Sequence, residues 1–229
     1  MITLRRSQER GHLNHGWLDT YHTFSFGNYY DPEHMHFRAL RVINEDRVAG
    51  GEGFGEHPHD NMEIITYVLS GALEHRDSMG SHGIIAPGDV QRMSAGTGIL
   101  HSEFNASTSE PVHLLQIWLM PKKRGVTPTY EQKHFAELTG WQLLVTPEPQ
   151  NGELKINQDA KLFRARMNAG ESLVTPLDAS RFGFLQVAKG RVTLAEARLE
   201  QGDGAQISGE SNPKLHADSE AEVLFFDLA

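Results

Sequence analysis

The sequence predicts an all-β protein, and three observations support this prediction. Runs of apolar and β-branched residues recur at short intervals, and most are bounded by Gly, Pro, Asn or Asp. The chain contains 22 glycines and 10 prolines, which interrupt long helices more readily than short strands. Helical periodicity is weak throughout, and Pro128–Leu138 is the best candidate for a short helix. We therefore expect a barrel or sandwich of short strands.

The expected strands follow one another along the whole chain. The first half has candidates at residues 37–43, 62–69, 71–77, 89–95 and 113–120. The second half has candidates at residues 142–147, 161–167, 184–190, 191–197 and 222–228. Their lengths, six to eight residues, are typical of strands and short for helices.

A similar pattern occurs in both halves of the chain. The corresponding positions are Gly71 and Gly190, Gly88-Asp89 and Gly202-Asp203, and His101 and His216. We interpret this similarity as the duplication of one β-unit. The expected domains span residues 1–130 and residues 131–229.

The composition excludes several classes of function. The formal net charge is −9 and the pI is about 5.8, so direct contact with nucleic acid is not expected. The chain has no cysteine, which rules out disulfides, thiolate metal ligands and a cysteine nucleophile. No apolar stretch reaches the length of a membrane span, and the N-terminus lacks the apolar core of a signal peptide. We therefore expect a cytoplasmic protein without membrane contact.

Histidines concentrate in the N-terminal half of the chain. Twelve of the 13 lie at or before His134. His57 and His59 are two residues apart, so they share one face if that segment is an extended strand, and Pro58 favours extension. Glu63 has the same parity as these two histidines and can therefore face the same interior.

A second pair with this spacing is His101 and Glu103. A strand carrying His-x-Glu beside a strand carrying His-x-His would bring three imidazoles and a carboxylate together. Such a donor set suits a divalent transition metal, and four protein ligands on an ion that prefers six leave two positions for substrate and O₂. The interpretation is a metal site with the ligands His57, His59, His101 and Glu103. Glu63 is either a further ligand or a partner that orients a histidine.

The other histidines and several aromatic residues have simpler interpretations. Surface positions are expected for His12, His15, His22, His34 and His36. Isolated structural roles are expected for His75, His82, His113 and His134. Core positions are expected for Phe24, Phe26, Tyr29 and Tyr30, with a pocket mouth as the alternative.

These residues resemble the two motifs of the cupins. The first cupin motif runs from a glycine through His-x-His and a glutamate to a second glycine. It is matched here by Gly51, His57, His59 and Glu63, with Gly71 one residue late. The second motif is Pro-x-Gly followed by histidine and asparagine. It is matched by Gly98, His101 and Asn105, whereas Gly96 stands where proline is usual.

The resemblance is closest to the pirin family, whose members consist of two cupin units. It rests on residues 15–32, 57–71, 93–105 and 114–121, and with the duplicated second unit it covers essentially the whole chain. The pattern HPH…E followed by GILHSE is specific for pirins among the cupins. The implied fold is all-β, with two tandem cupin (jelly-roll-like) β-barrels.

The resemblance to pirins also implies a ligand set. Pirins bind one metal, usually iron, in the first cupin unit, through residues that match His57, His59, His101 and Glu103. Glu63, the usual cupin ligand, would then not bind the metal, and the second cupin unit would be metal-free. The expected cofactor is a single divalent ion, Fe(II), with Mn, Co, Ni, Cu or Zn as alternatives.

The function implied by the resemblance is that of the bacterial quercetinase-type pirins, which can show quercetin 2,3-dioxygenase activity. We expect a metal-dependent dioxygenase that opens the central ring of a flavonol with O₂ and releases carbon monoxide. Glu103 is the expected catalytic base, which takes the proton of the 3-hydroxyl group. Nuclear animal pirins suggest an alternative, a redox-sensing regulatory protein that contacts a protein partner. A second alternative is an enzyme for another enol-bearing small molecule.

Overall fold

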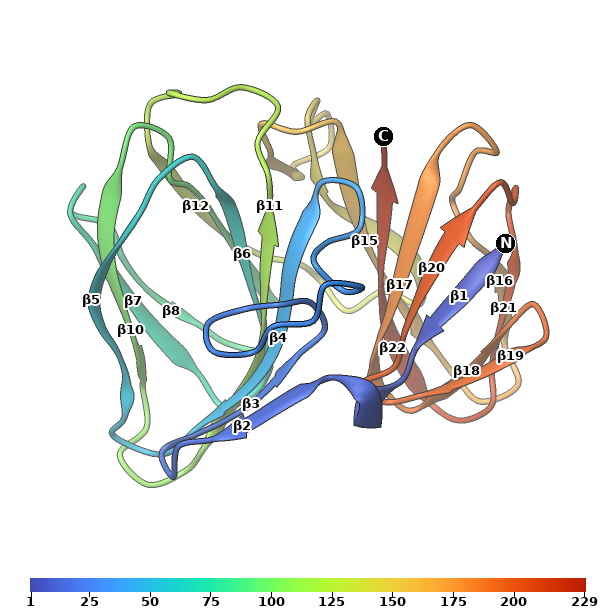
Figure 1. Ribbon diagram of the computed structural model, residues 1–229, viewed down its shortest axis with the longest axis horizontal. Helices are drawn as coiled ribbons and strands as arrows, with labels where there is room; N and C mark the ends of the chain where they lie inside the picture. Colours follow the sequence, from blue (N-terminus) through green and yellow to red (C-terminus); the bar gives the residue numbers. More distant parts are fainter. The chain divides into compact units, whose positions relative to one another are not determined.

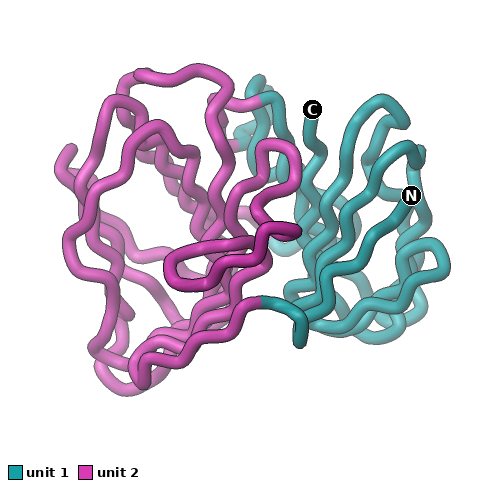
Figure 2. Tube along the Cα trace, in the orientation of Figure 1, with its two compact units in different colours: residues 1–10, 137–153, 159–229 teal, residues 11–136, 154–158 magenta.

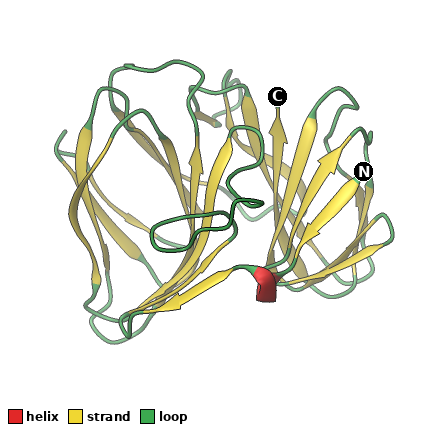
Figure 3. Cartoon of the chain, in the orientation of Figure 1, coloured by secondary structure: helices red, strands yellow, loops and turns green.

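The computed structural model describes residues 1–229 and consists almost entirely of strands, which confirms the predicted all-β class (Figures 1 and 3). The one helical segment is the 3₁₀ turn η1 (Ser7–Glu9), and no helix is long and apolar enough to cross a bilayer. By their internal contacts the residues group into two units (Figure 2). We call residues 11–136 and 154–158 the N-terminal unit, and residues 1–10, 137–153 and 159–229 the C-terminal unit.

The N-terminal unit contains a long and a short antiparallel sheet, with the strand orders β12-β9-β6-β11-β4-β3-β2 and β5-β10-β7-β8. The long sheet consists of β2 (Gly11–Asn14), β3 (Leu18–His22), β4 (Leu40–Val48), β6 (Glu63–Ser70), β9 (Asp89–Ser94), β11 (Val112–Leu119) and β12 (Thr129–His134). The short sheet consists of β5 (Gly53–His59), β7 (Leu73–Asp77), β8 (His82–Ile85) and β10 (Ile99–Asn105). The unit also contains the two-residue strand β14 (Leu154–Lys155).

The C-terminal unit repeats this architecture, with the strand orders β1-β20-β17-β22-β15-β13 and β16-β21-β18-β19. The longer sheet consists of β1 (Ile2–Arg5), β13 (Gly140–Thr146), β15 (Ala160–Met167), β17 (Phe182–Lys189), β20 (Gly204–Ser208) and β22 (Ala221–Leu228). The shorter sheet consists of β16 (Ser172–Val174), β18 (Arg191–Leu194), β19 (Ala197–Glu200) and β21 (Lys214–Ala217).

The hydrogen-bonded ladders of each unit form two separate sheets that do not close on each other, which agrees with the expected all-β fold of two jelly-roll-like units. The core lies between the sheets. In the N-terminal unit, Val68 and Leu114 of the long sheet pack with Leu73 and Ile85 of the short sheet. Each unit is therefore a two-sheet sandwich of the jelly-roll type, in which apolar side chains from both sheets meet.

The predicted duplication is visible in the strand order. The run β9-β6-β11-β4 of the N-terminal unit corresponds to β20-β17-β22-β15, and β10-β7 corresponds to β21-β18. Gly71 and Gly190 occupy equivalent turns, each between a strand of the longer sheet and a strand of the shorter sheet, with φ angles of 75° and 79° that an L side chain rarely adopts. The two units therefore share a turn geometry as well as a strand order.

The predicted short helix at Pro128–Leu138 is wrong. Residues Thr129–His134 form β12, which pairs antiparallel with β9 from Thr129↔Ser94 to His134↔Asp89. These residues complete the edge of the long sheet, and the ladder hydrogen bonds outweigh a weak local preference for helix.

The inner face of the long sheet carries a buried carboxyl group. Strand periodicity places Asp46 on the same face as Val48, which belongs to the core. Asp46 is 5% exposed, and its Oδ1 has no hydrogen-bond partner. Burial is the main reason that the pKa of Asp46 is raised to about 7; the nearby Thr20 hydroxyl lowers the pKa, and the charges of Glu103 and Glu45 raise it.

In metal-free protein, we expect Asp46→Asn to reduce the loss of stability at rising pH. The folded protein keeps the Asp46 proton up to about pH 7, whereas the unfolded chain loses it near the ordinary value of 3.8. The free energy of unfolding therefore falls as pH rises through this window. In urea unfolding between about pH 5 and 8, the wild type should lose roughly 2–3 kcal/mol more than the variant. Parallel pH profiles would contradict a buried, protonated Asp46.

Candidate metal centre

The two strands that carry the predicted ligands are neighbours in the short sheet. β5 ends at His59 and pairs antiparallel with β10, so that His57 lies opposite His101 and His59 opposite Ile99. The register shifts between His101 and Glu103, which marks a β-bulge. The pairing brings the His-x-His and His-x-Glu segments side by side, which is the arrangement that the metal-site interpretation requires.

Three imidazole rings converge at this pairing. Nε2 of His57 lies 3.0 Å from Nε2 of His101. The ring centroid of His59 lies 4.8 Å from the centroids of both His57 and His101. One nitrogen from each of the three rings lies within 4.8 Å of the other two. The nitrogens are close enough to surround one cation.

These histidines can present the lone pair of a neutral imidazole ring to a metal. Nδ1 of His57 donates a hydrogen bond of 2.7 Å to the carbonyl oxygen of Gly55, which leaves the lone pair on Nε2. Burial, and then the neighbouring histidines, lower the pKa of His101 to about 3 and the pKa of His59 to about 4. Neutral imidazole is the form that binds a metal, so the environment of the rings suits that role.

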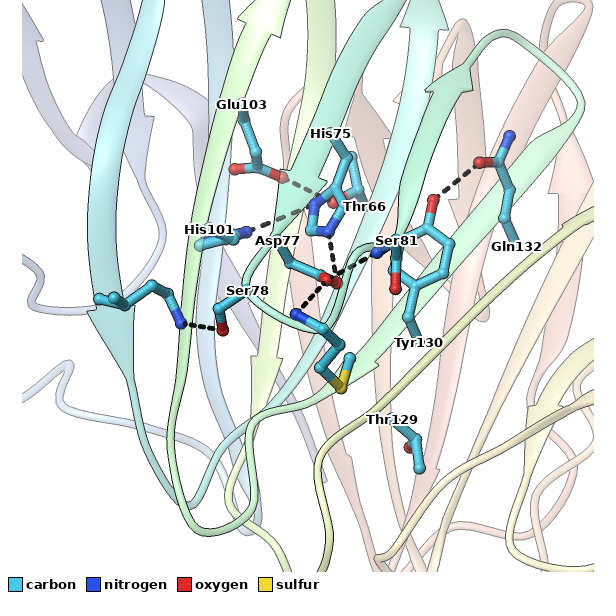
Figure 4. Close-up of polar contacts among 12 residues, drawn as sticks. Thr66, His75, Asp77, Ser78, Ser81, His101, Glu103, Thr129, Tyr130 and Gln132 are labelled. Atoms are coloured by element: carbon cyan, nitrogen blue, oxygen red, sulfur yellow. Dashed lines mark hydrogen bonds and ion pairs between the residues drawn. The ribbon is translucent and has the colours of Figure 1, made fainter.

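Glu103 is oriented by two side chains of the long sheet. Its Oε2 accepts a hydrogen bond of 2.8 Å from Nε2 of Gln116, and its Oε1 accepts one of 3.3 Å from the Thr66 hydroxyl. Thr66 and Gln116 are register partners on β6 and β11. Glu103 is 3% exposed and forms, with His75 and His101, a second group of potential metal-binding side chains within 4.8 Å (Figure 4).

Glu63 lies on the opposite face of the long sheet. The next residue, Ile64, packs in a core cluster, whereas the Glu63 carboxylate accepts a hydrogen bond of 2.8 Å from the Ser94 hydroxyl. The backbone and side-chain amides of Asn157 donate to the same carboxylate, each at 3.2 Å. The parity expectation is therefore wrong for Glu63. Glu63 points the other way because the chain is not extended throughout from His59 to Glu63. Asn61, between β5 and β6, has a φ of 44°, which interrupts the alternation of side chains between the two faces.

His75 is part of the cluster, and the expectation of an isolated structural role for it is wrong. Its ring lies on β7, with Nδ1 3.4 Å from Nδ1 of His101 and Nε2 3.1 Å from Oδ2 of Asp77. Burial alone would raise the pKa of Asp77, but hydrogen bonds from His75, Ser81 and Met79 hold it below its usual range. The available signal was the spacing His75-x-Asp77, which matches that of the two predicted pairs.

A cleft opens beside His59. It has a volume of about 540 Å³ and is lined by residues 58–60, Ser78 and residues 97–100. Trp118 packs edge-on against the His59 ring with centroids 4.8 Å apart, and Leu100 is exposed in the cleft wall. This volume falls within the range of pockets that bind drug-sized molecules, so the cleft can admit an aromatic compound next to His59.

The remaining histidines form separate contacts. Five of them pair with carboxylates, in the pairs His12–Asp19, His34–Asp31, His82–Glu74, His113–Glu45 and His134–Asp89. His22 is buried instead of at the surface, and its ring lies edge-on to Phe26 with centroids 5.3 Å apart. Phe24 is in the core, as expected, whereas Tyr30 is exposed.

Gly96, which stands where cupins usually have proline, has a φ of 50° that proline cannot adopt. A Cβ atom at this position would lie 2.0 Å from the carbonyl oxygen of Val126. The Gly96 carbonyl accepts a hydrogen bond of 2.9 Å from the amide of Asn61, which ties the loop after His59 to the loop before His101.

The equivalent position in the C-terminal unit has a different composition. His216 on β21 lies opposite Ser172 on β16, and its Nδ1 is 2.9 Å from the Ser172 hydroxyl. Ser172 thus has the place that His57 has opposite His101 in the N-terminal unit. One imidazole and one hydroxyl are a poor donor set for a transition metal.

Two stretches of the sequence match known protein families. Residues 3–119 match the pirin family, and residues 143–228 match the quercetinase C-terminal cupin domain. A curated relative from Escherichia coli (strain K12), named quercetin 2,3-dioxygenase, is 52% identical over 228 residues. The match covers 100% of this chain and 99% of that protein.

Solved structures give the same result. The crystal structure of YhhW from Escherichia coli is 52% identical, covers 100% of this chain and 98% of that chain, and superposes with a TM-score of 0.98. The structure of the bacterial pirin YhhW from Escherichia coli in complex with nickel(II) is also 52% identical, covers 100% of this chain and 99% of that chain, and has a TM-score of 0.96. The matches in sequence and fold extend over the whole chain, and the protein therefore belongs to the pirin family.

Proposed function

We propose that the N-terminal unit binds one divalent transition metal and that the loaded protein is a quercetin 2,3-dioxygenase. The proposed ligands are His57, His59, His101 and Glu103. The observation that carries this proposal is the convergence of three histidine nitrogens within 4.8 Å of one another, with one of the rings in the wall of a cleft. Imidazoles with one carboxylate suit a first-row transition metal better than calcium or magnesium, which prefer oxygen ligands. The relative named quercetin 2,3-dioxygenase supports the assignment of the reaction.

We assign Fe(II) as the metal that the protein binds in the cell. We assign the protein itself to the cytoplasm. Mn, Co, Ni, Cu and Zn are ions that the same donor set can accept. The nickel(II) complex of the Escherichia coli pirin fits this range. We assign no metal to the C-terminal unit, since Ser172 replaces a histidine there.

The proposed substrates are a flavonol and O₂. A metal bound here would lower the pKa of a coordinated hydroxyl, so the flavonol 3-hydroxyl can ionise near neutral pH. Glu103 takes this proton at Oε1, whose hydrogen bond from Thr66 is longer, at 3.3 Å, than the 2.8 Å hydrogen bond from Gln116 to Oε2. The Thr66 hydroxyl, which lies 3.0 Å from Oε1 of Gln116, can donate there when Oε1 of Glu103 becomes protonated. Burial of Glu103 and His101 keeps bulk water from these two side chains.

Metal-loaded protein should consume quercetin and release carbon monoxide. The chain can be loaded in turn with Fe(II), Mn(II), Co(II), Ni(II) or Cu(II), and the visible absorption of quercetin followed together with the gas. Metal-free protein is the control and should be inactive, because no coordinated hydroxyl is then available for deprotonation. Lack of turnover with all five metals would remove the assigned reaction.

The two carboxylates allow a matched comparison of metal binding. Glu103→Gln should weaken metal binding by at least about 100-fold, since losing an outer partner of a ligand alone costs 10–100-fold. Glu63→Gln should bind metal as the wild type does, because Glu63 contacts Ser94 and Asn157 on the other face of the sheet. Metal content after dialysis measures both effects. Equal metal loss in the two variants would show that the ligand assignment is wrong.

His101→Ala should lose the metal and stay folded. The core between the sheets is apolar and does not include His101, so its strands pack without the ion. Far-UV circular dichroism and thermal unfolding of the variant, beside metal-free wild type, measure this. An unfolded variant would mean that the ion has a structural role.

A further inference from the structure

We propose that His75 and Asp77 are positioning residues that orient His101 toward the metal through a chain of hydrogen bonds ending on a buried carboxylate. This inference rests on the proposed metal site and adds two residues to it. The side chains of His75 and Asp77 are both 0% exposed. Both residues lie on β7, which is the neighbour of β10 on the side away from β5.

The strand register sets the direction of the chain. Because β10 lies between β5 and β7, His101 has His57 opposite on one side and Asp77 opposite on the other. Its Nε2 is 3.0 Å from Nε2 of His57, and its Nδ1 is 3.4 Å from Nδ1 of His75. One ring nitrogen of His101 thus faces His57. The second faces His75 on β7 (Figure 4).

Asp77 sets the direction in which the hydrogen bonds between Asp77, His75 and His101 are donated. Its Oδ1 accepts hydrogen bonds from the backbone amides of Met79 at 2.9 Å and Ser81 at 3.0 Å. Its Oδ2 lies 3.1 Å from Nε2 of His75. An ionised carboxylate can only accept, so Nε2 of His75 donates and Nδ1 of His75 keeps the lone pair. Nδ1 of His75 is therefore an acceptor that faces His101.

This polarity favours the tautomer of His101 that a metal requires. A neutral His101 that donates from Nδ1 has its lone pair on Nε2, the nitrogen that faces His57. His57 reaches the same state by donating from Nδ1 to the Gly55 carbonyl. Acceptors of this kind fix the orientation of a ligand histidine and raise its basicity.

The packing around His75 holds its ring in one plane. Tyr130 stacks on it, with the centroids 4.7 Å apart and an interplanar angle of 27°. The Tyr130 hydroxyl donates a hydrogen bond of 2.8 Å to Oε1 of Gln132 and does not compete for the His75 nitrogens (Figure 4).

The C-terminal unit has no equivalent chain. Thr193 on β18 lies opposite His216, in the place of Asp77, and its hydroxyl donates to Asp218 at 2.8 Å. The buried His-x-Asp pair thus occurs in the unit that carries the proposed ligands.

Asp77→Asn tests the chain because it keeps the shape and exchanges one acceptor for a donor. With the amide oxygen retained by Met79 and Ser81, the amide nitrogen faces His75 and makes Nε2 of that ring accept. Nδ1–H of His75 would then oppose Nδ1–H of His101. The affinity of the protein for Zn(II), measured by competition with a chromogenic chelator, should fall about 10- to 100-fold.

A spectroscopic readout separates this effect from general damage. Long-range ¹H–¹⁵N spectra of the Zn(II)-loaded wild type should show His101 protonated at Nδ1. The resonance of that proton should shift upfield in Asp77→Asn, because its hydrogen bond is lost. The matched control is Asp19→Asn, since Asp19 also pairs with a histidine, His12, outside the site. It should leave both readouts unchanged.

His75→Phe is a second variant that keeps a ring against Tyr130 and leaves the turn at Asp77 intact. It should weaken Zn(II) binding in the same range. Unchanged Zn(II) affinity in either variant, when folded, would overturn the proposal. A wild type that binds Zn(II) as expected but never turns over quercetin with any metal would count against the proposed reaction alone, and leave the role of His75 and Asp77 standing.

Discussion

The proposed site depends on one backbone interaction, the antiparallel pairing of β5 with β10. Its register sets His57 opposite His101. A slip of one residue would turn every side chain of one strand to the other face and separate the histidines. The far end of β10 is anchored by Asn105, whose amide donates to the carbonyl oxygens of Val48, Ala49 and Glu110. The asparagine of the second cupin motif thus holds the end of β10 in place.

The inner face of the long sheet carries apolar residues that form the core and polar residues that contact Glu103. Along β6, Val68 joins the apolar core, whereas Thr66, two residues earlier on the same face, contacts Glu103. A buried carboxylate is costly unless its oxygens find donors, and Thr66 and Gln116 supply them. The apolar part of the sandwich can therefore hold the fold while the polar part stays available for metal and substrate.

The two units show that fold and site are separable. They share strand order and the turn glycines Gly71 and Gly190, yet Ser172 faces His216 where His57 faces His101. The scaffold therefore forms without the histidine cluster. In this protein, the proposed site therefore depends on the side chains that one copy of the scaffold carries.

The sequence by itself determined the all-β class, the duplication, and which residues share a strand face, because apolar runs, turn glycines and a period of two are local properties. That is why His57 with His59, and His101 with Glu103, could be paired from their spacing alone. Tertiary structure alone decided where Glu63 points, that β12 is a strand, that the sheets do not close, and that His75 lies against His101. Parity does not carry across a turn such as that at Asn61, and no local pattern states which strands become neighbours.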